Sequence, residues 1–311
     1  MKKFSDRLDF QITEESAVTL GKFDGIHKGH QKLIQKILEK KALGLKSVVF
    51  TFGQMPGTVF LGKKGRTILT KSERQQHLEQ MGVDYMIECP FVEQIIHMEP
   101  ERFIEEILVG QLHAKYIAVG PDFRFGYQRR GDCRLLTELS EVYGYEVEVF
   151  EKEKIEEQVI SSSYVREQLG QGAMERVSEF LGYPYYVSGT VVHGRRIGRT
   201  LGIPTINILP DDEKMLPPNG VYLTRTTVGA EQFYGITNIG VKPTISGEEA
   251  KGIETYLFDF DGDLYDQTLV VEFFAFEREE RRFDSLESLK MQLQKDVQWG
   301  KDYLKKSDFS S

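Results

Sequence analysis

The stretch AVTLGKFDGIHKGH, residues 17–30, decides how the first half of the chain folds. Its opening residues, Ala17 to Leu20, are apolar or β-branched and predict a buried strand that ends at Gly21. Asp24 and Gly25 indicate a bend, and an amphipathic helix begins near Gly29. A strand that passes through a glycine bend into a helix is typical of parallel α/β sheets, which bind ligands outside the carboxyl ends of their strands.

Two histidines, His27 and His30, stand at the start of this helix and have three interpretations. As metal ligands they lack companions, because a structural zinc ion takes four ligands. As polar residues at a capped helix start they need no function. As phosphate ligands they fit best, because a helix N-terminus offers free amides and partial positive charge, and Gly29 lets a phosphate approach the backbone.

The same alternation continues through the first half of the chain. Strands are predicted at residues 47–52, 85–91, 115–120 and 145–150, with helices at 70–81, 100–108 and 134–143 between them. The charged run at 151–158 is expected to be a solvated segment. The pattern predicts a Rossmann-like α/β domain over residues 1–184, with a parallel sheet and helices on both faces.

A different pattern begins at the boundary predicted near Tyr183–Tyr186. Short strands with turn residues between them predict an antiparallel barrel or sandwich over residues 185–311. Asp261-Gly262 is expected to be a hairpin turn. One terminal helix is expected from Ser285 to about Lys295, and Asp284 and Glu287 have the spacing of its capping box.

Composition narrows the class of protein. The chain has 311 residues, a net charge of −8 and two cysteines, Cys89 and Cys133. The acidic balance argues against general nucleic-acid binding, which needs a basic face. No apolar run approaches membrane-spanning length and no signal peptide is evident, so we expect no membrane partner and a cytoplasmic location. The sequence leaves the oligomeric state open.

The segment GTVVHGRRIGRTLGIPTINI, residues 189–208, predicts a second phosphate site. Gly194, Gly198 and Gly202 make a pliant loop whose amides can cover phosphates. Thr205 and Asn207 are two residues apart, so in a strand they face the same side and offer hard oxygen ligands suited to Mg²⁺. Without the flanking glycines they would be ordinary residues of a β-surface.

Three motifs of the first half resemble the nucleotidylyltransferase part of bacterial bifunctional riboflavin kinase/FAD synthetases. They are GKFDGIHKGH (21–30), VGPDFRFGYQRRGD (119–132) and ISSSYVREQL (160–169). The resemblance implies that His27, His30 and Arg166 stabilise the transferred phosphoryl group. It implies ATP and phosphate contacts at Gly21, Phe23, Asp24, Gly25, Gly29, Ser161, Ser162 and Ser163, and flavin contacts at Asp122, Phe123, Arg124 and Phe125. From the residues alone, Phe123 and Phe125 could cover a flat ring or be core aromatics.

The segment 189–208 resembles the riboflavin kinase motif of the same family, which implies a barrel. The resemblance assigns Thr205 and Asn207 to Mg²⁺ and Gly194, Arg199 and Gly202 to ATP. Glu254, in GIETYLFDFDGDLY (252–265), aligns with the general base, although a surface glutamate on a strand would look the same. Arg278 and Phe283, in REERRFDSLESL (278–289), are implied to contact flavin.

The implied function is flavin cofactor biosynthesis. ATP phosphorylates riboflavin to FMN, and a second ATP adenylylates FMN to FAD and pyrophosphate, with Mg²⁺ as cofactor. One departure matters, because Gln54-Met55 stands where the family has Pro-His. Two alternatives follow: a monofunctional riboflavin kinase with a degenerate first domain, or a non-catalytic flavin-sensing module.

Overall fold

The computed structural model describes residues 1–53, 65–194, 202–243 and 249–306. The chain forms two compact units, which divide between Ser162 and Ser163. This division assigns residues 163–184 to the second unit, whereas the sequence analysis placed them in the first domain, whose end at residue 184 stays a prediction.

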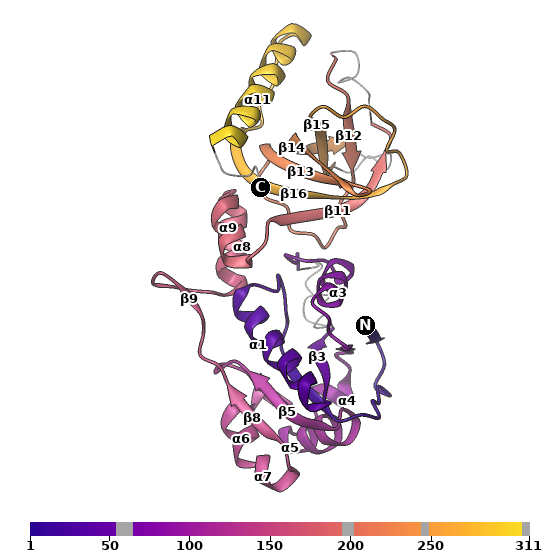
Figure 1. Ribbon diagram of the computed structural model, residues 1–311, viewed down its shortest axis with the longest axis vertical. Helices are drawn as coiled ribbons and strands as arrows, with labels where there is room; N and C mark the ends of the chain where they lie inside the picture. Colours follow the sequence, from indigo (N-terminus) through magenta and orange to yellow (C-terminus); the bar gives the residue numbers. More distant parts are fainter. Residues whose placement is uncertain (54–64, 195–201, 244–248, 307–311) are drawn as a thin grey trace. The chain divides into compact units, whose positions relative to one another are not determined.

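The first unit is built on a six-stranded sheet in which every strand pairs parallel to its neighbours (Figure 1). In spatial order its strands are β1 (Lys2–Ser5), β4 (Tyr85–Cys89), β3 (Lys46–Phe52), β2 (Ser16–Leu20), β5 (Ala114–Val119) and β8 (Glu146–Val149). This confirms the parallel sheet. Two hairpins are added: β6 (Arg124–Phe125) with β7 (Gly131–Asp132), and β9 (Lys154–Ile155) with β10 (Gln158–Val159).

Helices cover both faces of this sheet, as expected. α1 (Lys28–Glu39) buries Leu33, Ile34 and Ile37 on one face, and η2 (Phe103–Gln111) with α6 (Cys133–Glu138) supplies apolar side chains to the core on the other. The remaining helices described in this unit are η1 (Lys40–Leu43), α3 (Lys71–Gln80), α4 (Glu93–Ile96), α5 (Pro100–Arg102), η3 (Tyr127–Arg129) and α7 (Ser140–Tyr143).

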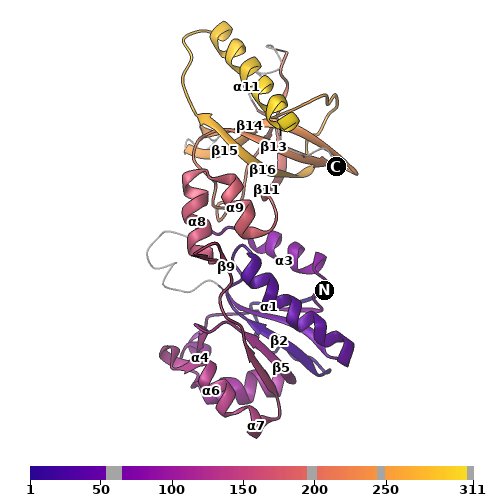
Figure 2. The ribbon, with the colours of Figure 1, turned by 60° about the vertical axis from the view of Figure 1, so that its left-hand side comes forward.

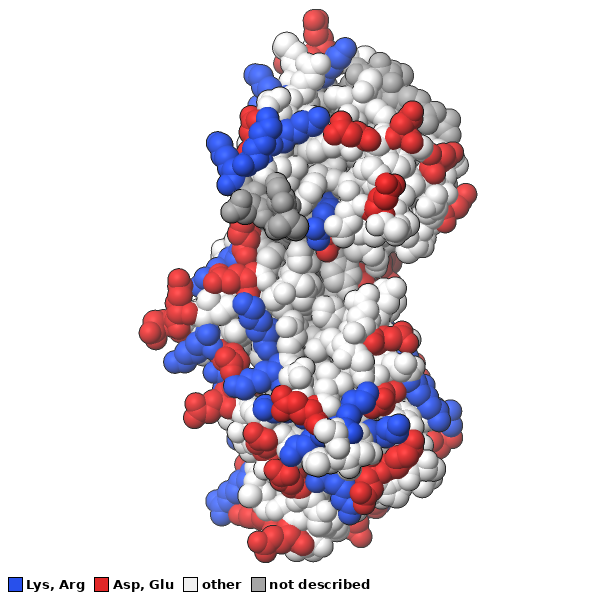
Figure 3. Space-filling view, in the orientation of Figure 1, with Lys and Arg blue, Asp and Glu red and all other residues white. Residues whose placement is uncertain are grey.

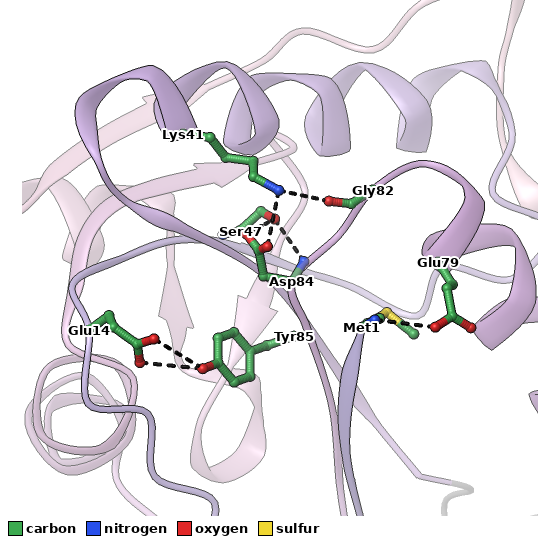
Figure 4. A network of polar contacts seen from close by, with 8 residues as sticks. All are labelled: Met1, Glu14, Lys41, Ser47, Glu79, Gly82, Asp84 and Tyr85. Atoms are coloured by element: carbon green, nitrogen blue, oxygen red, sulfur yellow. Dashed lines mark hydrogen bonds and ion pairs between the residues drawn. The ribbon is translucent and has the colours of Figure 1, made fainter.

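A polar network holds the amino ends of β3 and β4 together (Figure 4). Ser47 donates its backbone N–H and its hydroxyl to one carboxylate oxygen of Asp84, both at 2.9 Å. The Lys41 ammonium lies 3.0 Å from the other oxygen and donates to the carbonyl of Gly82. Burial raises the pKa of Asp84, but these hydrogen bonds and the Lys41 charge outweigh it and leave the pKa below its usual value. The edge opposite the carboxyl ends is therefore fixed by structural contacts.

The second unit is a closed six-stranded barrel with neighbouring helices, so the barrel expectation is confirmed and the sandwich alternative falls. Around the barrel the strands run β11 (Tyr185–Val192), β12 (Thr205–Ile208), β15 (Glu249–Leu257), β14 (Glu231–Pro243), β13 (Gly220–Val228) and β16 (Thr268–Glu279). Every pairing is antiparallel, and β16 closes the barrel against β11. α8 (Ser162–Gln171) precedes α9 (Met174–Leu181), which contacts β11 and β16.

The terminal helix α11 (Leu286–Lys306) lies along the outside of the barrel (Figure 2). It is longer than predicted, because Trp299, Tyr303 and Leu304 continue its apolar face against the barrel. Gly300, which weakens the helical pattern in the sequence, permits the close approach: an added Cβ would lie 2.8 Å from the Ile236 side chain. Among the described helices, none combines the length and the apolar character needed to cross a bilayer.

Two local expectations were wrong. The connection at Asp261-Gly262 is not a hairpin turn, because β15 and β16 are not neighbours in the barrel. The run at 151–158, by contrast, is solvated as expected: its residues are exposed or half-buried, and it folds back at Glu156 as the β9–β10 hairpin. The capping box expected at Asp284 and Glu287 is also wrong, because the residue that caps α11 is Ser285. The Ser285 hydroxyl accepts the Ser288 N–H at 3.1 Å, and the Ser288 hydroxyl accepts the Ser285 N–H at 3.2 Å.

Candidate active sites

The first candidate site lies where the order of strands in the sheet changes direction. The chain runs outward from β2 through β3 to β4, and then returns to place β5 on the other side of β2. The glycine bend follows β2 and the loop 120–126 follows β5, so both leave the sheet at neighbouring carboxyl ends. Parallel sheets bind ligands in this crevice.

The two histidines lie together at the start of α1. His27 is the N-cap residue, and its Nδ1 accepts the backbone N–H of His30 at 3.3 Å. The two imidazole rings are stacked, with centroids 3.7 Å apart and planes inclined by 14°. A Cβ added to Gly29 would lie 3.4 Å from the His27 ring, which is ordinary contact, so packing alone does not require glycine here.

Burial keeps both imidazoles neutral in the free protein. It lowers the pKa of His27 to about 4. Burial, with a smaller contribution from His27, holds the pKa of His30 well below its usual value. Because Nδ1 of neutral His27 accepts a hydrogen bond, its proton resides on Nε2. His27 therefore presents one N–H donor without carrying a charge.

The bend between β2 and α1 is strained. Phe23 and Ile26 are fully buried and have φ values of 47° and 35°, and Gly25 between them has φ 83°. Non-glycine residues adopt positive φ at a cost of about 1–3 kcal/mol, and such residues cluster at functional sites. The Phe23 ring also closes over Gly21, where an added Cβ would lie 3.3 Å away. The buried side chains of Phe23 and Ile26 hold the bend that carries the histidines.

Asp24 and Ser162 connect this bend to distant segments. The Asp24 carboxylate accepts backbone N–H groups from Ile68 at 2.8 Å and Leu69 at 3.4 Å. Its backbone carbonyl accepts the Ser162 hydroxyl at 2.7 Å. These contacts are structural, so the phosphate roles expected for Asp24 and Ser162 remain predictions, as do those of Ser161 and Ser163. Arg166 lies in α8, in the second unit.

The sequence analysis missed a buried ion cluster at the same edge of the sheet. Glu88, 2% exposed near the end of β4, lies 3.3 Å from the guanidinium of Arg74 and 3.2 Å from the ammonium of Lys71. Arg74 also donates to the carbonyl of Lys22 in the glycine bend at 3.4 Å. The sequence feature that could have revealed this ion cluster is Glu88, a carboxylate in an otherwise apolar strand.

The aromatic loop after β5 is less open than expected. Phe125 is buried in the core, and its ring lies 5.5 Å from that of Phe103. Phe123 is partly exposed and stacks on Phe125 at 5.5 Å with an angle of 17°. Asp122 pairs with Lys152 at 2.8 Å, and Arg124 with Asp132 at 3.1 Å. A flat ligand would meet Phe123 first, with Phe125 as its support.

The second candidate site is on the barrel, where three of the expected kinase residues meet. Thr205 donates its hydroxyl to Oε1 of Glu254 at 2.6 Å. Asn207 pairs directly opposite Glu254 across β12 and β15. Gly194 lies against the Asn207 amide, since an added Cβ would be 2.3 Å from Nδ2. The strands therefore gather Thr205, Asn207 and Glu254 on one face, as expected for β12.

A cavity of about 360 Å³ adjoins Thr205 at one end of the barrel. Its walls include inward-facing residues of the strands, among them Val191, Ile206 and Thr255, and the connection from Phe260 to Tyr265. This volume is within the range of small-molecule sites. The 260–265 connection was missed by the sequence analysis, which treated it as a turn.

Two residues expected to contact flavin lie near the end of β16 and just after it. Arg278 forms a two-pronged ion pair with the buried Asp296 of α11, at 3.0 and 2.5 Å, so its visible role is to fasten the terminal helix. Phe283 is partly exposed, with the Arg281 guanidinium 5.2 Å from its ring. Gly202 has φ 76°. Arg199, Gly198, Gln54 and Met55 lie outside the described residues.

Comparison with known proteins covers both units. The FAD synthetase family model matches residues 9–164 and the riboflavin kinase model matches residues 181–304. Bifunctional riboflavin kinase/FMN adenylyltransferase from Haemophilus influenzae is 35% identical over 296 residues, covering 94% of this chain and 96% of the relative. The Bacillus subtilis protein of that name is 35% identical over 293 residues and covers 91% of each chain.

Among solved structures, one described as a macrolide-efflux protein from Streptococcus pneumoniae shares the fold. It has a TM-score of 0.83 and 29% identity, and the match covers 94% of this chain and 96% of that chain. From the two family models and the full-length relatives, it follows that this chain belongs to the family of bifunctional riboflavin kinase/FMN adenylyltransferases.

Proposed function

We propose that this chain phosphorylates riboflavin to FMN with ATP and then adenylylates FMN to FAD with a second ATP, using one site in each unit. The observation that carries the kinase assignment is the 2.6 Å contact between Thr205 and Glu254, with Asn207 in register beside them. The stacked His27–His30 pair at the switch in strand order carries the adenylyl-transfer assignment.

In the kinase step, Glu254 is the group that accepts the proton of the ribityl 5′-hydroxyl. That hydroxyl oxygen attacks the γ-phosphorus in line, and the bond from the γ-phosphorus to the bridging oxygen breaks to release ADP. A loose phosphoryl-transfer transition state depends more on positioning than on strong base catalysis. The hydrogen bond from Thr205 fixes one carboxylate oxygen of Glu254.

The residues present suit a magnesium ion held mainly by substrate. Thr205 donates its only hydroxyl proton to Glu254, so the lone pairs of its oxygen remain for a cation. The Asn207 amide oxygen is a second hard ligand. Within the described residues no group of three or more His, Cys, Asp or Glu side chains is placed to hold an ion. Mg²⁺ usually keeps substrate phosphates and waters among its ligands. When bound, Mg²⁺ would neutralise phosphate charge.

In the adenylyl step, an FMN phosphate oxygen attacks the α-phosphorus of ATP, and pyrophosphate leaves. Charge grows on the α-phosphate oxygens in the transition state. Neutral His27 donates from Nε2, and the amides at the start of α1 that His27 does not cap add further donors. Ser161 and Ser162, at the end of the first unit, are proposed to hold the triphosphate, and Phe123 to cover the flavin ring.

The two assignments are tested in one flavin assay on the full chain. Riboflavin, ATP and Mg²⁺ are supplied, and FMN and FAD are resolved chromatographically. We expect Glu254→Gln to lose FMN formation while FMN supplied directly is still converted to FAD. We expect His27→Ala to accumulate FMN with FAD formation reduced by at least about 100-fold, the order of loss when a transition-state donor is removed.

The same assay separates the rival functions. If wild-type protein makes FMN but no more FAD than His27→Ala, the chain is a monofunctional riboflavin kinase. If wild-type protein binds flavin and turns over no ATP, it is a flavin-sensing module. The intact Thr205–Glu254 contact supports catalysis over sensing.

We also propose a cytoplasmic location and no nucleic-acid partner. Cys89 and Cys133 are both free thiols, which suits a reducing compartment. On the face shown in Figure 3, acidic and basic side chains are interspersed over both units, unlike the continuous basic surface of nucleic-acid binders.

A further inference from the structure

A row of polar side chains crosses the barrel strands at Glu254. Asn207 of β12 and Asn238 of β14 both pair directly opposite Glu254, one from each neighbouring strand. Directly paired residues share a face of the sheet, so the three side chains form one row across β12, β15 and β14. Asn238 is half-buried, and no hydrogen bond joins its side chain to another described residue. Asn238 is therefore a polar group beside the reacting carboxylate that the fold itself does not use.

Glu280, just after β16, brings a carboxylate to the same place. Gly240 lies two residues beyond Asn238 on the same face of β14. A Cβ added to Gly240 would lie 2.3 Å from Oε1 of Glu280 and 3.1 Å from Nδ2 of Asn238. The missing side chain of Gly240 thus leaves the space in which the Glu280 carboxylate approaches Asn238.

Asn219, which directly precedes β13, holds this carboxylate. Its Nδ2 donates to Oε2 of Glu280 at 3.2 Å. The amide must be turned this way because an ionised carboxylate only accepts hydrogen bonds. That orientation leaves Oδ1 of Asn219 buried with no hydrogen-bond partner among the described residues. Because an unsatisfied buried acceptor weakens a fold, the placing of Glu280 explains this contact better than stability does.

The direction of phosphoryl transfer assigns a substrate to this row. In the proposed kinase step, Mg²⁺ and the ATP phosphates are held on the β12 side of Glu254, at Thr205 and Asn207. The attacking and leaving oxygens are roughly in line with the phosphorus, so the acceptor substrate comes from the opposite side, which is β14. Neighbouring strands are only about 4.7–4.9 Å apart. Another hydroxyl of the ribityl chain can therefore reach Asn238 while the terminal hydroxyl meets Glu254.

We propose that Asn238 and Glu280 bind the inner hydroxyls of the ribityl chain and so make the kinase site select a polyol. Each hydroxyl both donates and accepts, an amide offers a donor and an acceptor, and a carboxylate accepts. Asn238 and Glu280 contact the substrate, whereas Asn219 and Gly240 act as positioning residues for Glu280. The inference rests on the proposed riboflavin kinase function.

The test compares two flavins as substrates of the full chain. One is riboflavin, and the other is its hydroxypentyl analogue, which keeps the ring and the terminal hydroxyl but lacks the three hydroxyls between them. We expect kcat/KM for riboflavin to fall about fivefold in Asn238→Ala and at least about tenfold in Glu280→Ala, which loses a charged acceptor. For the analogue, kcat/KM should change by less than about twofold in both variants, because Glu254 keeps its contacts.

Glu279, the exposed neighbour of Glu280, supplies the matched control. Glu279→Ala removes an equal charge one residue away and should leave the preference for riboflavin unchanged. Gly240→Ala tests the positioning of Glu280, because its methyl group must displace the carboxylate although every hydrogen-bonding group is retained. We expect its preference for riboflavin to fall as in Glu280→Ala. If Gly240→Ala does not fold, Asn238→Ala and Glu280→Ala decide the question.

The two substrates separate the possible outcomes. Wild-type protein that uses both flavins equally well overturns the proposal. Variants that lose the same factor on both flavins also overturn it, because the loss would then come from a disturbed Glu254. Wild-type protein that phosphorylates neither flavin would instead refute the proposed kinase function itself.

Discussion

At the residue scale, we expect Gly29 to matter for the approach of phosphate and not for the packing of the fold. An added Cβ would meet the His27 ring only at ordinary contact distance, 3.4 Å. We expect Gly29→Ala to change the free energy of unfolding by less than about 1 kcal/mol, in the stabilising direction. FAD formation from FMN should nevertheless fall about 100-fold, because the methyl group keeps phosphate from the α1 amides.

Thermal unfolding and the FMN-to-FAD rate of Gly29→Ala, measured on one preparation, check this expectation. Normal FAD formation would show that the α-phosphate does not approach α1 at Gly29. Riboflavin phosphorylation in the same protein is the internal control.

Gly194 gives the corresponding prediction for the barrel site. A Cβ there would lie 2.3 Å from Nδ2 of Asn207, so Gly194→Ala must displace the amide. We expect the Mg²⁺ concentration for half-maximal FMN formation to rise by about 10- to 100-fold, the usual effect of disturbing the support of a metal ligand. A magnesium titration measures it, and an unchanged midpoint would remove Asn207 from the metal site.

Single residues were predictable from sequence where spacing alone decides the geometry. Thr205 and Asn207 share a face because they are two apart in a strand, and His27 caps α1 because it begins the helix. The role of Phe125 could not be decided from the sequence, because an alternating aromatic pair has the same pattern whether it faces the core or a ligand. Glu88 and Arg74 meet only after β4 and α3 are packed together.

At the element scale, β16 buries part of a carboxylate, that of Glu277. Val221 of β13 pairs with Arg278 and Tyr222 pairs with Phe276, so Glu277 between them is left in a β-bulge. One Glu277 oxygen is buried and has no hydrogen-bond partner among the described residues. Burial, reinforced by Asp296, raises the pKa of Glu277 to about 7, although Arg278 and Arg281 oppose the shift.

The pH dependence of stability follows from that shift. The pKa in the folded state is about 7, above the ordinary value of 4.5, so the neutral form favours folding. Its contribution is fully present below about pH 4.5 and is lost as the pH rises through 7. We expect Glu277→Gln to raise the free energy of unfolding at pH 8 by about 1–2 kcal/mol, since partial exposure screens the effect, and to change little at pH 4.5.

Chemical denaturation of both proteins at the two pH values measures this difference. The exposed Glu279 of the same strand supplies a control substitution, Glu279→Gln, that should change stability equally little at both values. A Glu277→Gln protein with no gain at pH 8 would show that the carboxylate ionises without penalty.

Elements were predictable where a local pattern is complete. Thr70 and Glu73 form both bonds of the expected capping box on α3. The end of α11 was missed because Gly300 reads as a helix breaker until Ile236 is packed against it. The helix expected at 100–108 continues as the π-helix Phe103–Gln111, whose wider turn the apolar periodicity does not distinguish from an α-helix.

At the scale of the whole molecule, each unit has its own core and candidate site. A defect in one site should therefore leave the other intact, and FMN released by one molecule can serve another. We expect a mixture of His27→Ala and Glu254→Gln proteins to make FAD from riboflavin although neither does so alone. Adding enzyme that consumes free FMN should abolish this product, and a mixture that makes no FAD would show that FMN is not exchanged between molecules.

Most of the architecture was predictable from the sequence, because alternating strands and helices predict a parallel sheet and short strands with turns predict an antiparallel β-fold. The order of strands around the barrel was not predictable. The Asp261-Gly262 segment has the composition of a hairpin turn, yet it joins β15 to β16, and β12 and β11 lie between these two strands in the barrel. The position of β16 is set by its pairing with β11, which no local sequence pattern reveals.

The pairing of β16 with β11 also sets the order in which the two units can fold during translation. Tyr185 at the start of the barrel pairs with Phe273 near its end, so β11 has no partner on that side until the last strand has left the ribosome. The parallel sheet is complete once β8 has been synthesised. We therefore expect the first unit to gain protease resistance during translation while the barrel remains sensitive almost until termination, because non-local pairing waits for its most distant strand.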